Sequence, residues 1–168
     1  MSMNQLLVFR KKVFFIISSI ILIIICFSCF NSTLYVKMFY VNPKDNKLVY
    51  ENREVKKESN KIKHLTAIID DLLLGPVNPD FKNQFNSKSK LLAVVIEKNS
   101  VNLDFNRETF ETIDDPAIII NSIMHTIRFN DKSIERAFFY VEGILFNYIG
   151  NYGPLDKGVI SDNNYLSK

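Results

Sequence analysis

Cysteine and histidine are scarce in this chain, and their positions exclude most sites built on them. The two cysteines, Cys26 and Cys29, both fall in an apolar run near the N-terminus, and no cysteine follows them. Their C-x-x-C spacing lacks the structural context of a redox or zinc motif. The two histidines, His64 and His125, have no cysteine nearby and no H-x-x-x-H spacing, so we expect no metal site. Without disulfides, the folded part must be stabilised by its core.

The chain also lacks the motifs of common enzyme classes. It contains only 5 glycines, with neither a glycine-rich phosphate loop nor a Gly-x-Ser-x-Gly nucleophile motif among them. Asp70 and Asp71 are adjacent on a predicted helix, so their side chains point about 100° apart and do not converge on one substrate. We therefore predict a non-catalytic protein that needs no cofactor.

An excess of basic charge exists only at the N-terminus. Arg10, Lys11 and Lys12 are the only charged residues in 1–28, whereas residues 29–168 hold 18 basic and 18 acidic residues. A nucleic-acid-binding domain would need basic residues clustered on its folded part. The neutral balance after residue 28 argues against nucleic acid as a partner, and the basic flank is typical of export signals.

A long apolar run, residues 13–30 (VFFIISSIILIIICFSCF), follows this basic flank. As a helix its 18 residues would reach about 27 Å, slightly less than a hydrocarbon core of about 30 Å. Three interpretations remain open. Ser28-Cys29 resembles the end of a bacterial lipoprotein signal, in which Cys29 would be lipidated after removal of residues 1–28. The run could instead be an uncleaved membrane anchor or a plain cleaved signal peptide.

The first two interpretations predict the same location. Residues 29–33 form a short polar tether, and the rest of the chain is held at a membrane on its extracytoplasmic side, in the periplasm or at the cell surface. The basic flank then remains in the cytoplasm under the positive-inside rule.

The remaining chain alternates predicted strands and helices in the order β-β-α-β-β-α-β. Alternating polarity and many aromatic and β-branched residues indicate the strands. These span residues 34–41, 47–55, 91–97, 100–105 and 136–141, with a sixth at 144–149. The first and second strands, and the third and fourth, are close enough in sequence to form hairpins.

Two amphipathic helices are predicted between these strands. We expect the first to begin at Ser59 as its N-cap and to end at Gly75-Pro76, because glycine permits the left-handed conformation and proline cannot continue a helix. The second begins at Asp115-Pro116, with an acidic cap and proline at the first helical position. The expected buried stripes are Ile62, Leu65, Ile69 and Leu72 in the first helix, and Ile119 or Ile120, Ile123 and Ile127 in the second.

This order predicts an α+β fold, with two helices covering one face of a mostly antiparallel sheet of five or six strands. We assign residues 34–149 to this domain. The segment 150–168, rich in Gly, Asn and Asp, is expected to be a flexible, poorly packed tail.

Residues 34–143 together resemble a GerMN domain, the sporulation and spore-germination domain of bacterial envelope proteins. The resemblance lies in LYVKMFYVNPKDNKLVYENREV at 34–55, the Leu-Leu-x-Gly-Pro helix end at 72–76, SKSKLLAVVIEKNSVNLDF at 87–105 and IIINSIMHTIRFNDKSIERAFFYVEG at 118–143. The usual Pro-x-Gly-Thr-like turn before the third strand is replaced by residues 85–89. The resemblance implies a small, exported, often membrane-tethered module for envelope assembly, without metal or cofactor.

Few residues remain as candidates for a specific role. Asp104 is expected to accept hydrogen bonds from the turn at Asn106 and Arg107, and His125 to be a hydrogen-bonded helix residue. Several strand aromatics are expected mostly in the core, with any exposed ones marking a binding face; they are Tyr35, Phe39, Tyr40, Phe138, Phe139 and Tyr140. The predicted partner is another envelope protein, and the alternative is peptidoglycan or a small envelope ligand.

Overall fold

The computed structural model describes residues 13–14, 17–19, 32–111, 115–149 and 152–167. The chain divides into two units, Met1–Thr33 and Leu34–Lys168. Cys29 and most of the predicted anchor lie outside the described residues, so the three interpretations of that segment stay predictions. In the part that is described, no helix combines the length and the apolar character needed to cross a membrane.

The second unit is an α+β domain whose first five strands lie within one residue of their predicted bounds, whereas the sixth covers only Ile144–Leu145 and not the predicted 144–149. β1 (Thr33–Asn42) and β2 (Lys47–Lys56) form a hairpin, and β3 (Leu91–Glu97) and β4 (Ser100–Phe105) form another. β5 (Arg136–Val141) and the short β6 (Ile144–Leu145) follow α3.

The predicted single sheet is wrong, because the strands form two sheets. One contains β1 and β2, and the other has the order β3-β4-β5-β6. β5 runs parallel to β4, whereas the other pairs in the larger sheet are antiparallel. The parallel pair arises because α3 connects the two strands as a crossover, which returns the chain to the same end of the sheet.

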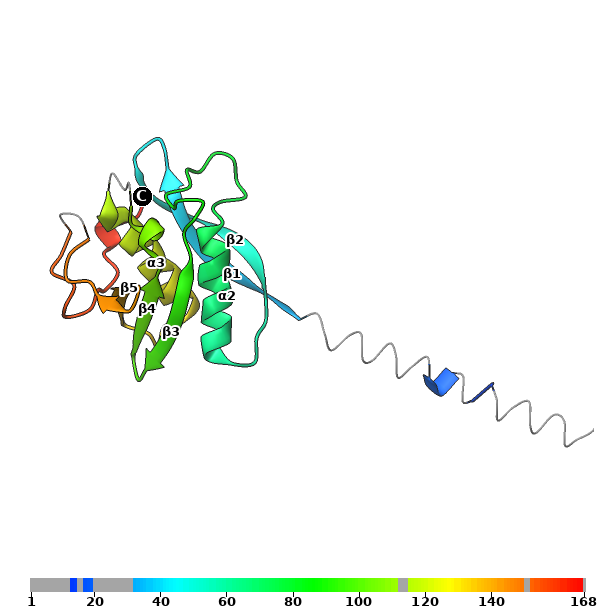
Figure 1. The fold of residues 1–168 in the computed structure, drawn as a ribbon. Helices are drawn as coiled ribbons and strands as arrows, with labels where there is room; N and C mark the ends of the chain where they lie inside the picture. Colours follow the sequence, from blue (N-terminus) through cyan, green and yellow to red (C-terminus); the bar gives the residue numbers. More distant parts are fainter. Residues whose placement is uncertain (1–12, 15–16, 20–31, 112–114, 150–151, 168) are drawn as a thin grey trace, which may run out of the picture. The chain divides into compact units, whose positions relative to one another are not determined.

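Helix α2 (Lys61–Leu73) lies beside β3 and contacts β2 (Figure 1). Its N-cap is Asn60 and not the predicted Ser59, since the Asn60 side chain accepts hydrogen bonds from the amides of Ile62 and Lys63. Its predicted end is confirmed. Gly75 has φ of +94°, a left-handed value that only glycine adopts without strain.

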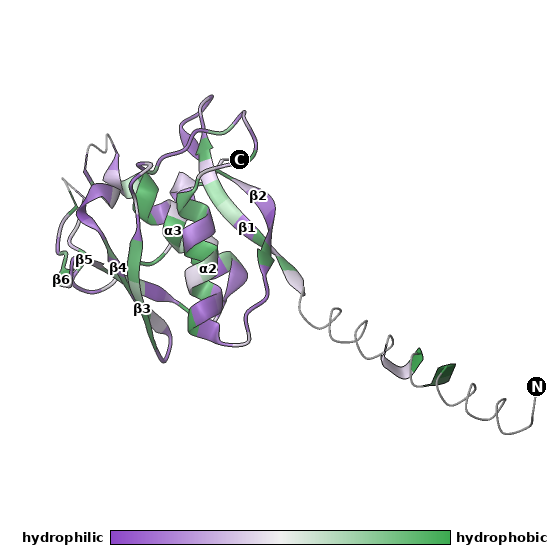
Figure 2. Ribbon diagram, turned by 45° about the vertical axis from the view of Figure 1, so that its right-hand side comes forward, coloured by the Kyte–Doolittle hydropathy of each residue, from purple (hydrophilic) through white to green (hydrophobic). Residues whose placement is uncertain are grey.

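Helix α3 (Pro116–Asn130) is the centre of the domain. Figures 1 and 2 both show it between the larger sheet and the β1–β2 hairpin. The Asp115 side chain caps it as predicted, accepting from the amides of Ala117 and Ile118. Every residue from Pro116 to Ile127 is buried. The predicted stripe of Ile119, Ile120, Ile123 and Ile127 is therefore buried, but the burial extends beyond one stripe to the whole circumference of the helix. The helix is covered on all sides.

A stripe of polar side chains on α3 takes the place of a third strand beside β1. Ser122 Oγ donates to Phe39 O (2.6 Å), and Thr126 Oγ1 accepts from Phe39 N (3.1 Å). Asn130 completes the stripe, accepting from Lys37 N (3.0 Å) and donating to Lys37 O (2.8 Å). Spacing by four places these residues on one helix face. They satisfy the backbone edge that a strand would otherwise pair, which explains why the sheet is divided.

The C-terminal segment packs against the domain, unlike the poorly packed tail that its composition predicted. Leu155 and Val159 are buried, and Val159 forms a β-bridge with Ala137 of β5. Near the end of the chain, Ser167 N donates to Leu48 O (2.9 Å). Buried apolar side chains and paired backbone groups thus hold the described residues 152–167 in place. The predicted domain limit at 149 leaves out this packed segment.

Candidate functional site

Two open surfaces and two polar networks contain most of the residues that could serve a function. The first surface is the outer face of the larger sheet. Cross-strand partners share a face, and the pairs Ala93–Asp104, Val95–Asn102 and Asp104–Tyr140 all lie on the side away from α3. These five residues line a shallow hollow of about 210 Å³.

This outer face is partly apolar. Val95 is 48% exposed, and Leu145, which pairs with Tyr140, is 37% exposed. The opposite face carries the fully buried side chains of Val101, Leu103 and Phe139. The alternation of apolar and polar residues along residues 100–105 therefore predicted correctly which side chains face the core and which face outward.

Asp104 has a different partner from the one predicted. Its Oδ1 accepts from Gly143 N (3.1 Å) in the β5–β6 turn, and not from Asn106 or Arg107. The side chain of Asn106 instead accepts from Lys90 N (2.8 Å). The parallel pairing of β4 with β5 places residue 104 beside the β5–β6 turn, and this neighbour could not be read from local sequence.

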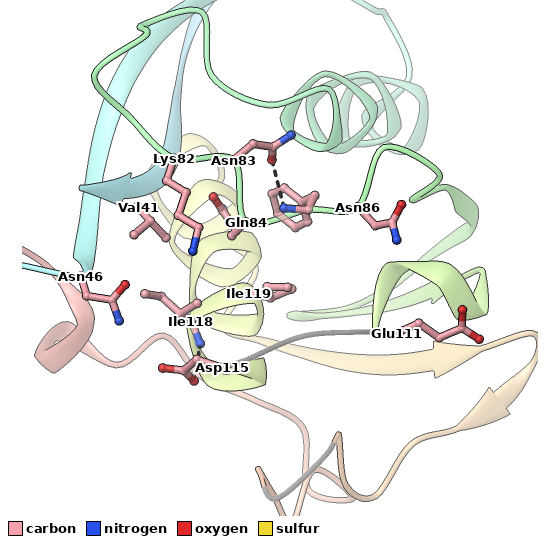
Figure 3. A pocket seen from close by; sticks show the side chains of 11 residues that line it. Val41, Asn46, Lys82, Asn83, Gln84, Asn86, Glu111, Asp115, Ile118 and Ile119 are labelled. Carbon is pink, nitrogen blue, oxygen red and sulfur yellow. Dashed lines mark hydrogen bonds between the residues drawn. The ribbon is translucent and has the colours of Figure 1, made fainter. Parts of the chain in front are cut away.

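The second surface is a cavity of about 340 Å³ at the N-terminal end of α3 (Figure 3). Val41, Phe85, Ile118 and Ile119 supply its apolar lining, and all four are buried. Its polar lining comes from the β1–β2 turn, the loop after α2 and the chain before α3. These polar residues are Asn46, Lys82, Asn83, Gln84, Asn86, Glu111 and Asp115.

Gln84 connects this cavity to the polar stripe of α3. Its Nε2 donates to Phe39 O (3.1 Å) and to Ser122 Oγ (2.5 Å). Its Oε1 is buried and has no hydrogen-bond partner among the described residues. Asn83 and Asn86 use their Oδ1 atoms within the loop, accepting from the amides of Phe85 and Lys88. Their amide nitrogens remain as donors, and the carboxylates of Glu111 and Asp115 supply acceptors in the lining of the cavity.

The Gly75-Pro76 motif is held by a charged network on β2. Arg53 donates to Gly75 O (3.1 Å), to Glu51 Oε1 (3.0 Å) and to Asp71 Oδ1 (2.9 Å). The Glu51 carboxylate accepts from the amides of Val77 and Asn78, each at 3.0 Å. Burial opposes ionisation of Glu51, but these amides and Arg53 hold its pKa below the ordinary value. The network fixes the turn after α2 and is structural.

His125 is a buried, hydrogen-bonded helix residue, which agrees with its predicted role. Its Nε2 lies 3.0 Å from Asp162 O in the C-terminal segment, and Asn121 Oδ1 accepts from Asp162 N (2.9 Å). A hydrogen bond to a carbonyl requires a proton on Nε2. Burial lowers the pKa of His125, more than the contact with Asp162 raises it. The neutral ring therefore joins the C-terminal segment to α3.

The predicted aromatic set divides between core and surface. Phe39, Tyr40 and Phe139 are buried, Phe138 and Tyr140 are half-buried, and Tyr35 is exposed. Tyr50 and Phe129, which the sequence did not single out, are also exposed. Within the described part of the chain, no group of three or more His, Cys, Asp or Glu side chains is placed to hold a metal ion.

Comparison with known proteins supports the predicted family. A family model described as sporulation and spore germination (Germane) matches residues 37–144. No curated protein matches the chain.

Solved structures with the same fold come from two bacteria. The first GerMN domain of the Bacillus subtilis sporulation protein GerM has a TM-score of 0.56 at 18% identity, covering 81% of this chain and 98% of that one. The tandem GerMN domains of the same protein give 0.61 at 16%, covering 77% of this chain and 46% of that one. A proposed lipoprotein from Clostridium perfringens gives 0.53 at 16%, covering 81% and 94%.

The family model covers well over half of the chain, and the fold agrees with it. This chain belongs to the Germane family of sporulation and spore germination domains.

Proposed function

We propose that this protein is a non-catalytic module of the bacterial cell envelope, tethered on the extracytoplasmic side of a membrane and acting by docking on another envelope protein. The tether is a lipid on Cys29. The family and the apolar run at 13–30 support the location. The similarity in fold to a proposed lipoprotein is consistent with it.

The open face of the larger sheet is the observation that carries the docking proposal. Its hollow combines the apolar side chains of Ala93 and Val95 with the polar edges of Asn102, Asp104 and Tyr140. An apolar centre with polar and aromatic groups around it is the usual composition of a protein–protein interface. The partner surface is therefore expected to be apolar, with hydrogen-bond donors opposite the Asp104 carboxylate.

Crosslinking in cells tests this docking surface. The full chain is purified from crosslinked membranes as wild type, as Val95→Glu and as Val77→Glu. Val77 is 71% exposed and lies outside the hollow, so it is the matched control. We expect Val95→Glu to lose a partner that wild type and Val77→Glu retain. Identical partners in all three samples would contradict the proposal.

The anchor is tested separately with Cys29→Ala. A lipidated Cys29 predicts that this substitution abolishes lipid labelling and leaves the precursor unprocessed. Unchanged size and membrane attachment would show that residues 13–30 are kept as an uncleaved helix instead.

The cavity of Figure 3 favours a second function, the binding of peptidoglycan or a small envelope ligand. Its volume lies at the low end of ligand pockets, about 300–1,000 Å³. Amide side chains above an apolar floor suit a ligand rich in hydroxyl and amide groups. The carboxylates of Glu111 and Asp115 in the lining supply acceptors for such a ligand.

Co-sedimentation of residues 32–168 with cell-wall sacculi tests this function. Asn46 has φ of +53°, so Asn46→Gly removes a lining amide without backbone strain. Lys98, with φ of +51°, does not line the cavity, and Lys98→Gly is the matched control. Loss of one hydrogen bond predicts about 2- to 10-fold weaker binding for Asn46→Gly alone. Wild-type binding no stronger than that of a neutral control protein would exclude the function.

A further inference from the structure

We propose that the domain rests on the membrane through one defined face, the tether-side patch, formed by Tyr35, Lys37, Tyr50 and Phe129. The proposed occupant of this patch is the headgroup region of an anionic bilayer. The inference rests on the tethering part of the proposed function, and it adds which surface of the domain meets the lipid.

The composition of the patch is that of a membrane-interface surface. Tyr35 is 70% exposed, Tyr50 47% and Phe129 46%. Lys37 Nζ lies 4.0 Å from the centre of the Tyr50 ring and 5.3 Å from that of Phe129. Tyrosine, tryptophan and lysine are enriched where a protein meets the headgroups, because each has an apolar body and a polar end. A phenylalanine such as Phe129 adds apolar area at the boundary with the acyl chains.

The patch is also held rigidly. Tyr35 and Lys37 are two residues apart on β1, so their side chains project from the same face of the hairpin. Asn130 binds both backbone groups of Lys37, and Phe129 packs on the buried Phe39 ring with centroids 4.9 Å apart. The Tyr50 ring also packs on Phe39, with centroids 5.8 Å apart, so the fold holds both Tyr50 and Phe129 in place.

The length of the tether limits where the domain can lie. Five residues, 29–33, separate the proposed lipid from the body of the domain, and fully extended they reach at most about 18 Å. A domain of this size has a radius of gyration of about 14 Å. The tether is thus shorter than the domain is wide, and Tyr35 follows it by only two residues. Some face near the start of β1 must lie close to the bilayer.

Charge at this end of the domain suits an anionic surface. The hairpin brings the start of β1 beside the end of β2, and Lys61 of α2 pairs with Asp131 after α3 (2.9 Å). Segments 33–37, 54–63 and 128–132 therefore meet at this end, with seven basic residues and three acidic ones, although residues 29–168 are neutral in total. The basic residues are Lys37, Lys56, Lys57, Lys61, Lys63, Arg128 and Lys132, and the acidic ones are Glu54, Glu58 and Asp131. Lysines close to an anionic bilayer each favour binding.

Tryptophan fluorescence tests the orientation, because the chain contains no tryptophan. Residues 34–168 form a compact unit with its own core. A protein of residues 32–168 is attached by an N-terminal polyhistidine tag to vesicles of phosphatidylethanolamine, phosphatidylglycerol and a nickel-chelating lipid. Brominated acyl chains then quench a tryptophan near the bilayer. Tyr50→Trp reports the patch, and Tyr148→Trp, at a site 57% exposed in the wild type, is the control.

We expect severalfold stronger quenching for Tyr50→Trp than for Tyr148→Trp, and weaker quenching when Lys37→Glu is added to Tyr50→Trp. Equal quenching at the two sites overturns the proposal. If Tyr50→Trp fails to fold by circular dichroism, Tyr35→Trp replaces it with the same expected result. Flotation of the full chain with vesicles reports the native anchor independently. Failure of the anchor and failure of the patch are therefore distinguishable.

Discussion

Replacing Thr126 with valine tests whether α3 satisfies the free edge of β1. Thr126 and Phe39 are both buried, and Thr126 Oγ1 accepts a hydrogen bond from the Phe39 amide at 3.1 Å. Valine keeps the shape and the β-branching but removes the acceptor. A buried amide left without a partner costs about 1–3 kcal/mol. We expect the free energy of unfolding of residues 32–168 to fall by that amount.

Urea unfolding followed by circular dichroism measures this loss, and Thr66→Val is the matched control. Thr66 lies in α2 and donates only to a carbonyl of its own helix, Ile62 O (2.9 Å). Its replacement should change the free energy of unfolding by less than about 0.5 kcal/mol. Amide hydrogen exchange adds a local readout, since the Phe39 amide should lose protection in Thr126→Val. A Thr126→Val protein as stable as Thr66→Val, with Phe39 still protected, would refute the role of the polar stripe.

Three further substitutions test other contacts. Burial lowers the pKa of His125, so on acidification the unfolded chain binds a proton before the folded one does. The free energy of unfolding therefore falls as the pH drops through about 6.5. His125→Gln should flatten this pH dependence in urea titrations at several pH values, and an unchanged slope would contradict the reasoning. Arg53→Ala leaves Asp71 without its ion pair (2.9 Å) in a partly exposed network. Calorimetry should show that the free energy of unfolding falls by about 1–3 kcal/mol. An unchanged stability would show that water replaces the guanidinium. Gly75→Ala forces an alanine to φ of +94° and places its Cβ 2.5 Å from Asn83 Nδ2, so a loss of about 1–2 kcal/mol is expected; wild-type stability would mean that the turn relaxes.

Local signals in the sequence predicted the elements well. The helix end at Gly75 and the helix start at Asp115 depend on backbone conformation and on capping within a few residues. The β3 and β4 boundaries follow from alternation and a two-residue turn. Each of these features is decided by neighbours in the chain, so the sequence alone contains the information.

The arrangement of these elements depended on contacts between distant residues. Ser122, Thr126 and Asn130 look like polar interruptions of an apolar helix until β1, more than 80 residues earlier, lies beside them. The spacing of four was visible and could have indicated a buried polar face. The packing of 152–167 was missed for a related reason. Its composition favours loops, but Asp162 is held by two polar residues of α3.

The rise per residue of α3 and of β1 explains why the helix can bond the edge of β1 in place of a strand, and why it does so over only a few residues. Four residues advance a helix by about 6.0 Å, and two residues advance a strand by about 6.7 Å. A polar stripe on α3 can therefore follow the edge of β1 through neighbouring hydrogen-bonding positions before the spacing drifts. The hydrogen bonds between α3 and β1 end at Phe39. At Val41 the backbone of Lys82 takes over, donating to Val41 O at 2.8 Å. The loop after α2 is thus required to complete the edge of β1, and the same loop forms one wall of the cavity next to it. A ligand that moves this loop would therefore also loosen the edge of β1, which connects the cavity to the strand that follows the proposed tether.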